Sequence, residues 1–355
     1  MALEGDGTVY TAPHYRQPRR CVLKRRFRYR KCLSKTFFDA LSGVFLVLKQ
    51  GLGLVRPGGA AASDWLLVML LGIIWGTSFL SIAVALEGYG PITVAAGRIL
   101  LAAVALTLVA QASGRGIPSP RGSDGRRIWL YACGLALFAN ALPFLLLAWG
   151  QQYVTSAFAG ITMATVPLFV LGLAHAFVPG ERLSAPKTVG FLFGLAGVVL
   201  LLGGNALERN GDGIVDLARL ACVGAAAGYA IGSIVARRAP PIPLLSFSAA
   251  SLLAAAAMIV PLALLFEGIP QVPRAGYLST LALVYLGLVP TGLATVILVR
   301  VVRSAGPGFL SQVNYHVPVW AVIFGVVLLG ETLPPQFLAA LAVILAGVAL
   351  SRRRT

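Results

Sequence analysis

Two stretches decide the fold, FAGITMATVPLFVLGLAHAFVPGERL at residues 158–183 and FLSQVNYHVPVWAVIFGVVLLGETL at residues 309–333. Both begin with Phe, carry a Val-Pro pair in the middle and end on Gly-Glu-x-Leu. A Leu-Ala-Gly-Val tetrapeptide follows each of them, at residues 195–198 and 345–348. The matching positions are 151 and then 150 residues apart, so one single-residue gap aligns them all. The second half of the chain therefore repeats the first.

Both stretches belong to apolar blocks of about twenty residues, the length that crosses roughly 30 Å of hydrocarbon. The chain of 355 residues is 58% hydrophobic and 12% charged, against about 25% charged in soluble domains. Its mean hydropathy is +0.84. The blocks do not alternate polar and apolar residues, which excludes the strands of a membrane barrel. We predict an all-α polytopic membrane protein with ten transmembrane helices, at residues 65–86, 91–110, 128–148, 155–177, 186–204, 217–236, 243–266, 276–299, 306–329 and 334–350.

Basic residues predict how these helices are oriented, because cytoplasmic loops carry an excess of Lys and Arg. With the N-terminus inside, the inner segments hold 25 of the 29 basic residues, the outer segments hold 3, and Arg98 lies within a span. Without the 12 that precede residue 65, the count is still 13 against 3. Both termini are therefore expected to be cytoplasmic. Since each half has five spans, the halves form two inverted five-helix repeats, a plan that many secondary transporters use.

The net charge of +17 does not indicate a nucleic-acid partner. Ten of the basic residues lie between Arg16 and Lys35, and most of the others lie in short loops. The four cysteines have no metal-ligand spacing, so neither a metal nor a cofactor is expected. The expected partners are a small-molecule solute and the lipid of the inner membrane, and the oligomeric state stays open.

Residues 1–64 form a basic N-terminal extension that differs from the rest of the chain. The mildly apolar run Phe37–Val55 suits a helix lying on the anionic cytoplasmic leaflet. A disordered tail, or an extension outside the mature protein, is the other interpretation. A signal peptide is not expected, because the basic region is too long.

Three features stand out along the spans: Trp75-Gly76-Thr77-Ser78-Phe79 in the first, Pro91 followed by Gly97-Arg98 in the second, and a Pro…Gly-Glu-x-Leu…Gly pattern that ends each half. With them, the chain resembles the drug/metabolite transporter superfamily, in its ten-helix EamA-type branch. The resemblance covers two repeats, 65–204 and 217–350. It implies a central cavity lined by the first four helices of each half, with each fifth helix peripheral. Many members carry an acid before the proline of the ninth span, but Val317 stands there in this chain, so a proton-coupling role of such an acid does not transfer.

Arg98 lies seven residues past Pro91, about 10 Å below the predicted outer boundary. An ionisable group at mid-bilayer costs about 2.5–3.5 kcal/mol on insertion scales and is a functional candidate for that reason. Two interpretations are open for Arg98. It is either a bidentate donor to a substrate carboxylate or phosphate, or a structural arginine that bonds backbone carbonyls near a helix break.

Prolines within the predicted spans free backbone carbonyls, which are tolerated at this depth only where they are buried or line a cavity. The third, fourth, eighth and ninth spans are therefore the predicted cavity walls. His316, near the midplane of the ninth span, is also a candidate proton carrier. A packing or structural role is the alternative for every candidate. The candidate substrate-binding residues are Trp75, Arg98, Asn140, Thr165, Asn314 and His316.

These features predict a secondary transporter, an exporter of small organic metabolites such as amino acids or related solutes. A polytopic membrane enzyme and a scaffold without transport are the alternatives. An enzyme needs a catalytic cluster such as paired carboxylates, and no carboxylate lies within a predicted span. No catalytic residue is therefore expected. Glu181 and Glu331, at loop–helix junctions, are interpreted as helix caps, because an acid is stabilised at a helix N-terminus.

Overall fold

The computed structural model describes residues 61–178, 184–203 and 213–351, and these residues form only helices and their connections. All of them belong to the second of the two units of the chain, Arg56–Thr355. Glu181 and the run at Phe37–Val55 lie outside the described residues. We call residues 61–203 the first half and residues 213–351 the second half.

Eight helices of the described residues are long and apolar enough to cross a membrane, and two shorter apolar helices follow them. The first half contains α2 (Ala62–Ala85), α3 (Pro91–Ala112), α4 (Gly122–Leu135), α5 (Leu142–Gly150), α6 (Ser156–Thr162), α7 (Val166–Phe177) and α8 (Ala185–Leu202). The second half contains α9 (Gly213–Arg238), α10 (Leu244–Phe266), α11 (Val272–Ala275), α12 (Tyr277–Leu286), α13 (Ala294–Leu310), α14 (Val313–Phe324) and α15 (Pro335–Ser351). Short π-helical or 3₁₀ segments join several of them: η1 (Ala136–Ala141), η2 (Met163–Thr165), η4 (Gly287–Leu293) and η5 (Gly325–Leu329).

The ninth predicted span, 306–329, differs in detail from the structure. The apolar helix Tyr277–Leu310 runs on past the predicted end of the eighth span. Its break falls at Gly306, whose φ of 84° is not helical and suits a residue without a Cβ. A second turn, at Ser311 and Gln312, precedes α14. Each of the ten predicted spans thus has an apolar helix, but the ninth begins with a bent segment.

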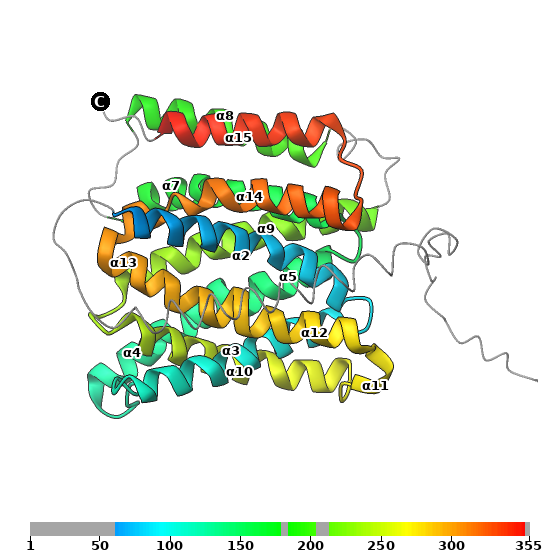
Figure 1. Cartoon of the computed structure of the whole chain (residues 1–355). Coiled ribbons are helices and arrows are strands. Elements are labelled where there is room, and N and C mark those ends of the chain that lie inside the picture. Colours follow the sequence, from blue (N-terminus) through cyan, green and yellow to red (C-terminus); the bar gives the residue numbers. More distant parts are fainter. Residues whose placement is uncertain (1–60, 179–183, 204–212, 352–355) are drawn as a thin grey trace, which may run out of the picture. The chain divides into compact units, whose positions relative to one another are not determined.

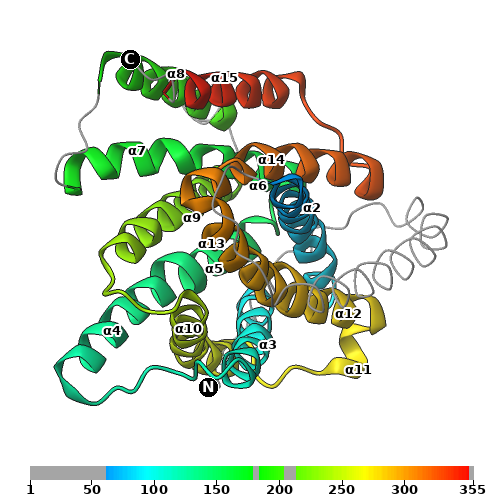
Figure 2. The ribbon, with the colours of Figure 1, turned by 60° about the vertical axis from the view of Figure 1, so that its left-hand side comes forward.

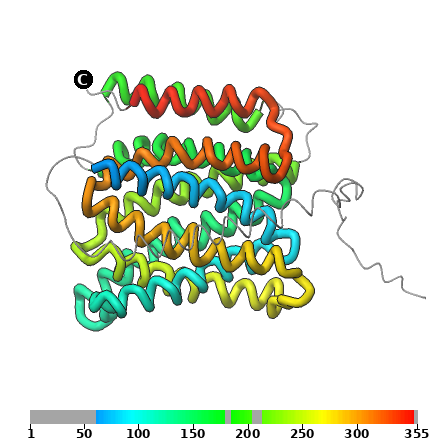
Figure 3. The backbone as a smooth tube through the Cα atoms, viewed as in Figure 1, coloured from blue at the N-terminus to red at the C-terminus, as the bar shows by residue number. Residues whose placement is uncertain are grey.

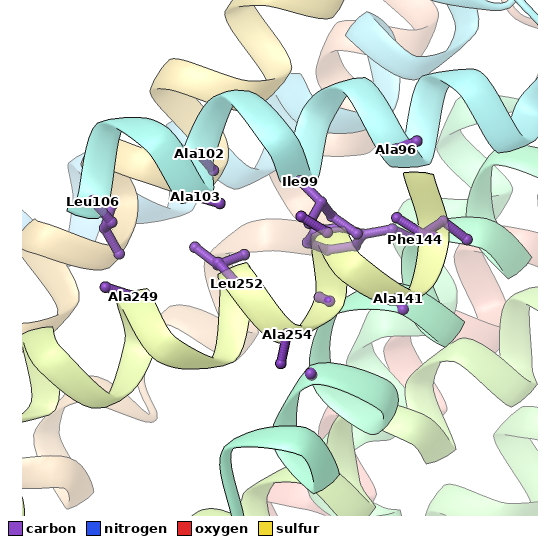
Figure 4. Close-up of a cluster of buried hydrophobic side chains, with 14 of the residues drawn as sticks. Ala96, Ile99, Ala102, Ala103, Leu106, Ala141, Phe144, Ala249, Leu252 and Ala254 are labelled. Atoms are coloured by element: carbon purple, nitrogen blue, oxygen red, sulfur yellow. The ribbon is translucent and has the colours of Figure 1, made fainter. Parts of the chain in front are cut away.

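Two extensive helix pairs join the two halves. Helix α3 packs along α10, and α2 packs along α14, so each pair joins one helix from each half. Figure 4 shows the first interface, where Ala96, Ile99, Ala102 and Ala103 of α3 lie next to α10. Small side chains let helices approach closely, and that packing drives helix association in lipid.

The last helices of the two halves form a layer of their own. Helix α8 packs chiefly against α15, and this pair lies apart from the remaining helices in Figures 1 and 2. The seam between them is made by glycines. A Cβ on Gly190 would lie 2.5 Å from the carbonyl oxygen of Gly347, and a Cβ on Gly347 would lie 2.5 Å from the backbone nitrogen of Gly194. The peripheral position expected for each fifth helix is therefore observed.

Glycines also bring α14 onto α2. A Cβ on Gly72 would lie 2.6 Å from the Cβ of His316, and one on Gly76 would lie 2.5 Å from the Cβ of Trp320. The motif Trp75-Gly76 therefore combines an aromatic side chain with a position at which a helix of the other half makes close contact.

We predict that Gly347→Ala lowers the thermal stability of the detergent-solubilised protein, because the added methyl group separates α8 from α15. The expected loss is about 1–3 kcal/mol, typical of overpacking. Gly224→Ala is the matched control, because a Cβ there meets only Leu146 at an ordinary 3.6 Å. Thermal unfolding followed by tryptophan fluorescence measures both. Equal melting temperatures for the two variants would contradict the packing assigned to the seam.

Candidate functional site

Arg98 of α3 is the charged residue at the centre of the candidate site, with 5% of its surface exposed. Its Nε donates a hydrogen bond of 2.7 Å to the Oγ1 of Thr291. Its guanidinium carbon lies 3.7 Å from the ring centroid of Phe144, a cation–π contact. Tyr229 of α9 packs edge-on against Phe144, with ring centroids 6.4 Å apart. Residues of three other helical segments, η4, α5 and α9, therefore lie around the guanidinium group that α3 carries.

No carboxylate of the described residues forms an ion pair with Arg98, and within these residues its two terminal nitrogens have no hydrogen-bond partner. An arginine has five N–H donors in a planar fork, and Nε supplies one of them. The two terminal NH₂ groups at the open side of the fork are the pair that binds a carboxylate or a phosphate bidentately. The geometry thus holds Arg98 at its Nε and leaves its anion-binding edge available.

The partner of Arg98 is fixed by an irregular helix. Pro290 lies in the π-helical segment η4, and a proline removes the N–H that would bond the carbonyl four residues earlier, at Leu286. The hydroxyl of Thr291 donates to that carbonyl oxygen over 2.8 Å. The same hydroxyl oxygen then accepts from Arg98, so its orientation is set from both sides.

The first half repeats this arrangement. Its π-helical segment η1 begins at Ala136 and η4 begins at Gly287, which are 151 positions apart, as are Asn140 and Thr291. The Nδ2 of Asn140 donates to the carbonyl oxygen of Leu135 over 3.3 Å and to the Oγ of Ser251 over 3.1 Å. Asn140 and Thr291 therefore each donate a hydrogen bond to a carbonyl oxygen of their own helix. Each also bonds a residue in the second helix of the opposite half. π-Helical segments of this kind are frequent at functional sites.

Trp75 of α2 also contacts η4. Its Nε1 donates to the carbonyl oxygen of Pro290 over 3.0 Å. Two residues further along α2, the hydroxyls of Thr77 and Tyr285 share a hydrogen bond of 2.7 Å. Both contacts join α2 of the first half to the α12–η4 segment of the second half, beside the bond between Arg98 and Thr291.

The structure brings together two of the six predicted residues, because Trp75 and Arg98 bond adjacent residues of η4. Asn140 lies in the corresponding segment η1 and bonds Leu135 and Ser251.

The other three lie elsewhere among the described residues. Thr165 is fully buried and donates to the carbonyl of Thr162 in its own span. Asn314 and His316 are half-buried on α14, with His316 packed against Gly72. In the described part of the chain, none of the three has a hydrogen bond, ion pair or ring contact with the group around Arg98.

Sequence reasoning missed Thr291, Phe144 and Tyr285. For Thr291 a signal existed, because it follows a proline that interrupts a predicted span and it aligns with Asn140 at the 151-residue offset. Phe144 and Tyr285 gave no such signal, since aromatic residues within apolar spans are usually packing residues.

Comparison with known proteins places the whole helical region in one family. The model of the EamA-like transporter family matches residues 64–203 and 217–353. The two matched segments correspond to the first and second halves.

Relatives are found among transporters of bacteria. A probable terminal-alkyne amino-acid exporter of Streptantibioticus cattleyicolor is 30% identical over 295 residues, covering 82% of this chain and 93% of its own. The inner membrane transporter YedA of Escherichia coli is 29% identical over 280 residues, covering 79% of this chain and 87% of its own. A solved crystal structure superposes with a TM-score of 0.59 at 25% identity, covering 82% of this chain and 98% of its own.

We predict that Thr291→Val destabilises the protein by about 1–3 kcal/mol, because it leaves the buried Nε of Arg98 unpaired. Thr291→Ser keeps the hydroxyl and is expected to restore most of the stability. The control is Thr295→Val, since that hydroxyl only donates to the backbone of Thr291 in the same helical run, over 2.6 Å. Thermal unfolding in detergent measures all three. A similar loss in Thr295→Val would show that hydroxyl removal alone accounts for the effect.

Proposed function

The chain belongs to the EamA-like transporter family, and we propose that it exports small organic metabolites that carry a carboxylate, amino acids first among them, by alternating access. Arg98 carries this proposal. It is a buried cation without an acidic partner among the described residues, held so that its bidentate edge stays available. An uncompensated charge within a membrane is costly, so an anionic solute group that pairs with it is stabilised.

The surroundings of Arg98 suit a solute with an apolar or aromatic part. The ring of Phe144 lies against the guanidinium and Tyr229 packs on Phe144, while Thr291 supplies a polar contact. Trp75 bonds the residue before Thr291, and Asn140 lies in the corresponding segment of the first half. Ligand sites in proteins typically combine an apolar lining with few fixed polar groups. We therefore propose Trp75, Arg98 and Asn140 as substrate-binding residues, with the carboxylate bound by Arg98.

Alternating access is supported by the way in which the halves meet. The candidate site is built from both halves, with Arg98 of α3 on Thr291 of η4 and Asn140 of η1 on Ser251 of α10. A rocking of one half against the other would therefore change both pairs of contacts together. Transporters of inverted-repeat architecture place their substrate site at such a repeat interface.

Export is proposed from the relative whose name identifies it as a probable amino-acid exporter. The solute's own gradient is the proposed driving force. Proton coupling would instead depend on a titratable group within a span, and His316, packed on α2 at Gly72, is the proposed carrier for that case. Transport measured with and without an imposed proton gradient separates the two modes.

We predict that Arg98→Gln raises the KM for a transported amino acid by about 30-fold or more, because removing one member of a buried charge pair costs at least about 2 kcal/mol. The protein is reconstituted in proteoliposomes, and a mixed pool of amino acids and metabolites is first screened for uptake and efflux. Arg98→Lys keeps the charge but loses the bidentate fork, so its loss is expected to be smaller. Arg219→Gln is the matched control, since this arginine pairs with Asp216 near the start of α9.

A second comparison tests whether Arg98 binds the carboxylate of the solute. The probe is the amine that matches the transported amino acid but lacks its carboxylate. Arg98→Gln is expected to leave any transport of this amine unchanged. Folding of each variant is checked by size-exclusion chromatography. A folded Arg98→Gln variant that transports the amino acid like the unchanged protein would contradict the assigned role. No transport of any solute by the unchanged protein would contradict the function itself.

A further inference from the structure

Glu267, in the second half, holds the start of a helix of the first half. It follows the last residue of α10, and its carboxylate accepts two hydrogen bonds from backbone N–H groups of α3. Ile92 donates over 2.9 Å and Thr93 over 2.8 Å. These N–H groups belong to the first turn of α3, where no helical carbonyl is available to them.

Glu331 does the same at a second helix. It follows η5, and its carboxylate accepts from the backbone N–H groups of Ser156, over 2.8 Å, and Ala157, over 2.9 Å. These two residues begin the span Ser156–Phe177 of the first half. The interpretation of Glu331 as a helix cap is confirmed, but the capped helix is in the other half and is not the helix that follows Glu331 in the chain.

Each of the two carboxylates accepts hydrogen bonds from two successive backbone N–H groups at the start of a helix. Each bonds one N–H that lies 175 positions earlier and the next one 174 positions earlier. Hydrogen bonds to a carboxylate are roughly twice as strong as neutral ones. The positive end of the helix dipole adds to the attraction. The two carboxylates are therefore strong, charge-dependent connections between the halves.

Further contacts between the halves lie at the same end of the bundle. The hydroxyls of Tyr89 and Thr280 share a hydrogen bond of 2.8 Å, and the Oγ of Ser279 donates to the carbonyl of Val84 over 3.0 Å. Figure 3, viewed as Figure 1, shows α12 and the connection between α14 and α15 at this end. The distribution of basic residues predicts that this end faces outward.

We propose that Glu267 and Glu331 form a paired latch that keeps this end of the transporter closed, and that both carboxylates must release their helix N-termini for the end to open. The proposal rests on the proposed alternating access. It concerns the equilibrium between the closed and open forms, and it does not depend on the identity of the solute.

Two glycines make room for the latch. A Cβ on Gly90 would overlap the carboxylate of Glu267, and a Cβ on Gly325 would lie 2.5 Å from the Oε2 of Glu331. The φ of Gly90 is −68°, which alanine adopts without strain. Gly90→Ala therefore displaces the carboxylate without removing it, which provides a second way to open the latch.

A cysteine at position 279 reports the opening. Ser279 is 4% exposed and lies between the halves at the latched end, so a thiol there reacts slowly with a maleimide while that end is closed. Cys21, Cys32, Cys133 and Cys222 are first replaced, so that Ser279→Cys supplies the thiol that is measured. The full chain is studied in lipid nanodiscs, where both faces of the membrane are accessible, and no solute is needed.

In this background Glu267→Gln and Glu331→Gln are each expected to raise the labelling rate about ten-fold, because a glutamine amide keeps one of the two N–H bonds and loses the charge. Gly90→Ala is expected to have a similar effect. The matched control is Asp216→Asn, which removes a carboxylate at the same end that pairs with Arg219 of its own helix over 3.1 Å. Its labelling rate is expected to stay unchanged.

The labelling outcomes test the latch independently of the solute that the protein transports. Faster labelling in both glutamine variants, with folded protein by size-exclusion chromatography, supports the paired latch. A change in only one variant contradicts the pairing, and unchanged labelling in all three latch variants contradicts the latch. Absence of solute transport in proteoliposomes would contradict the proposed function but leave the labelling result valid.

Discussion

The hydroxyl of Thr291 is the group on which the centre of this structure depends. In a membrane every polar backbone group needs a partner within the protein, and Pro290 lacks the N–H of a regular helix. The hydroxyl of Thr291 donates to the carbonyl oxygen of Leu286 in this irregular segment, and the same oxygen accepts from Arg98. One hydroxyl therefore bonds an irregular helix of the second half and orients a buried cation of the first half. Asn140, at the corresponding place in the other half, donates to the carbonyl oxygen of Leu135 and to the hydroxyl of Ser251.

Much of the fold follows from the sequence, because twenty-residue apolar blocks and repeated motifs determine which segments cross the membrane. The positions at which those segments bend follow less readily. The helix that contains the eighth span runs past residue 299, its predicted end, to Leu310, and it is interrupted at Gly306, whose φ is positive. Hydropathy measures how apolar a segment is, and it carries no information about the backbone angle at one glycine.

The candidate site was predictable only in part, for a related reason. Sequence gives the depth of a side chain along its span but not the direction in which it points or the helix that it meets. Arg98 and Trp75, both predicted from their position within a span, meet η4 of the opposite half. His316 was assigned by the same criteria, yet its direction along α14 places it against Gly72. Pairing between the halves decides these neighbours, and it depends on the packing of glycines and alanines over the whole interface.

The hydrogen bond between Arg98 and Thr291 also has a consequence for how the protein is made. The two residues are 193 positions apart. At roughly 5–20 residues per second, ribosomal synthesis separates their appearance by about 10–40 s. During that time α3 already carries its guanidinium group, while the hydroxyl that will hold it has not been synthesised. The first half must therefore wait in the lipid or at the insertion machinery with a charge that only the second half can orient.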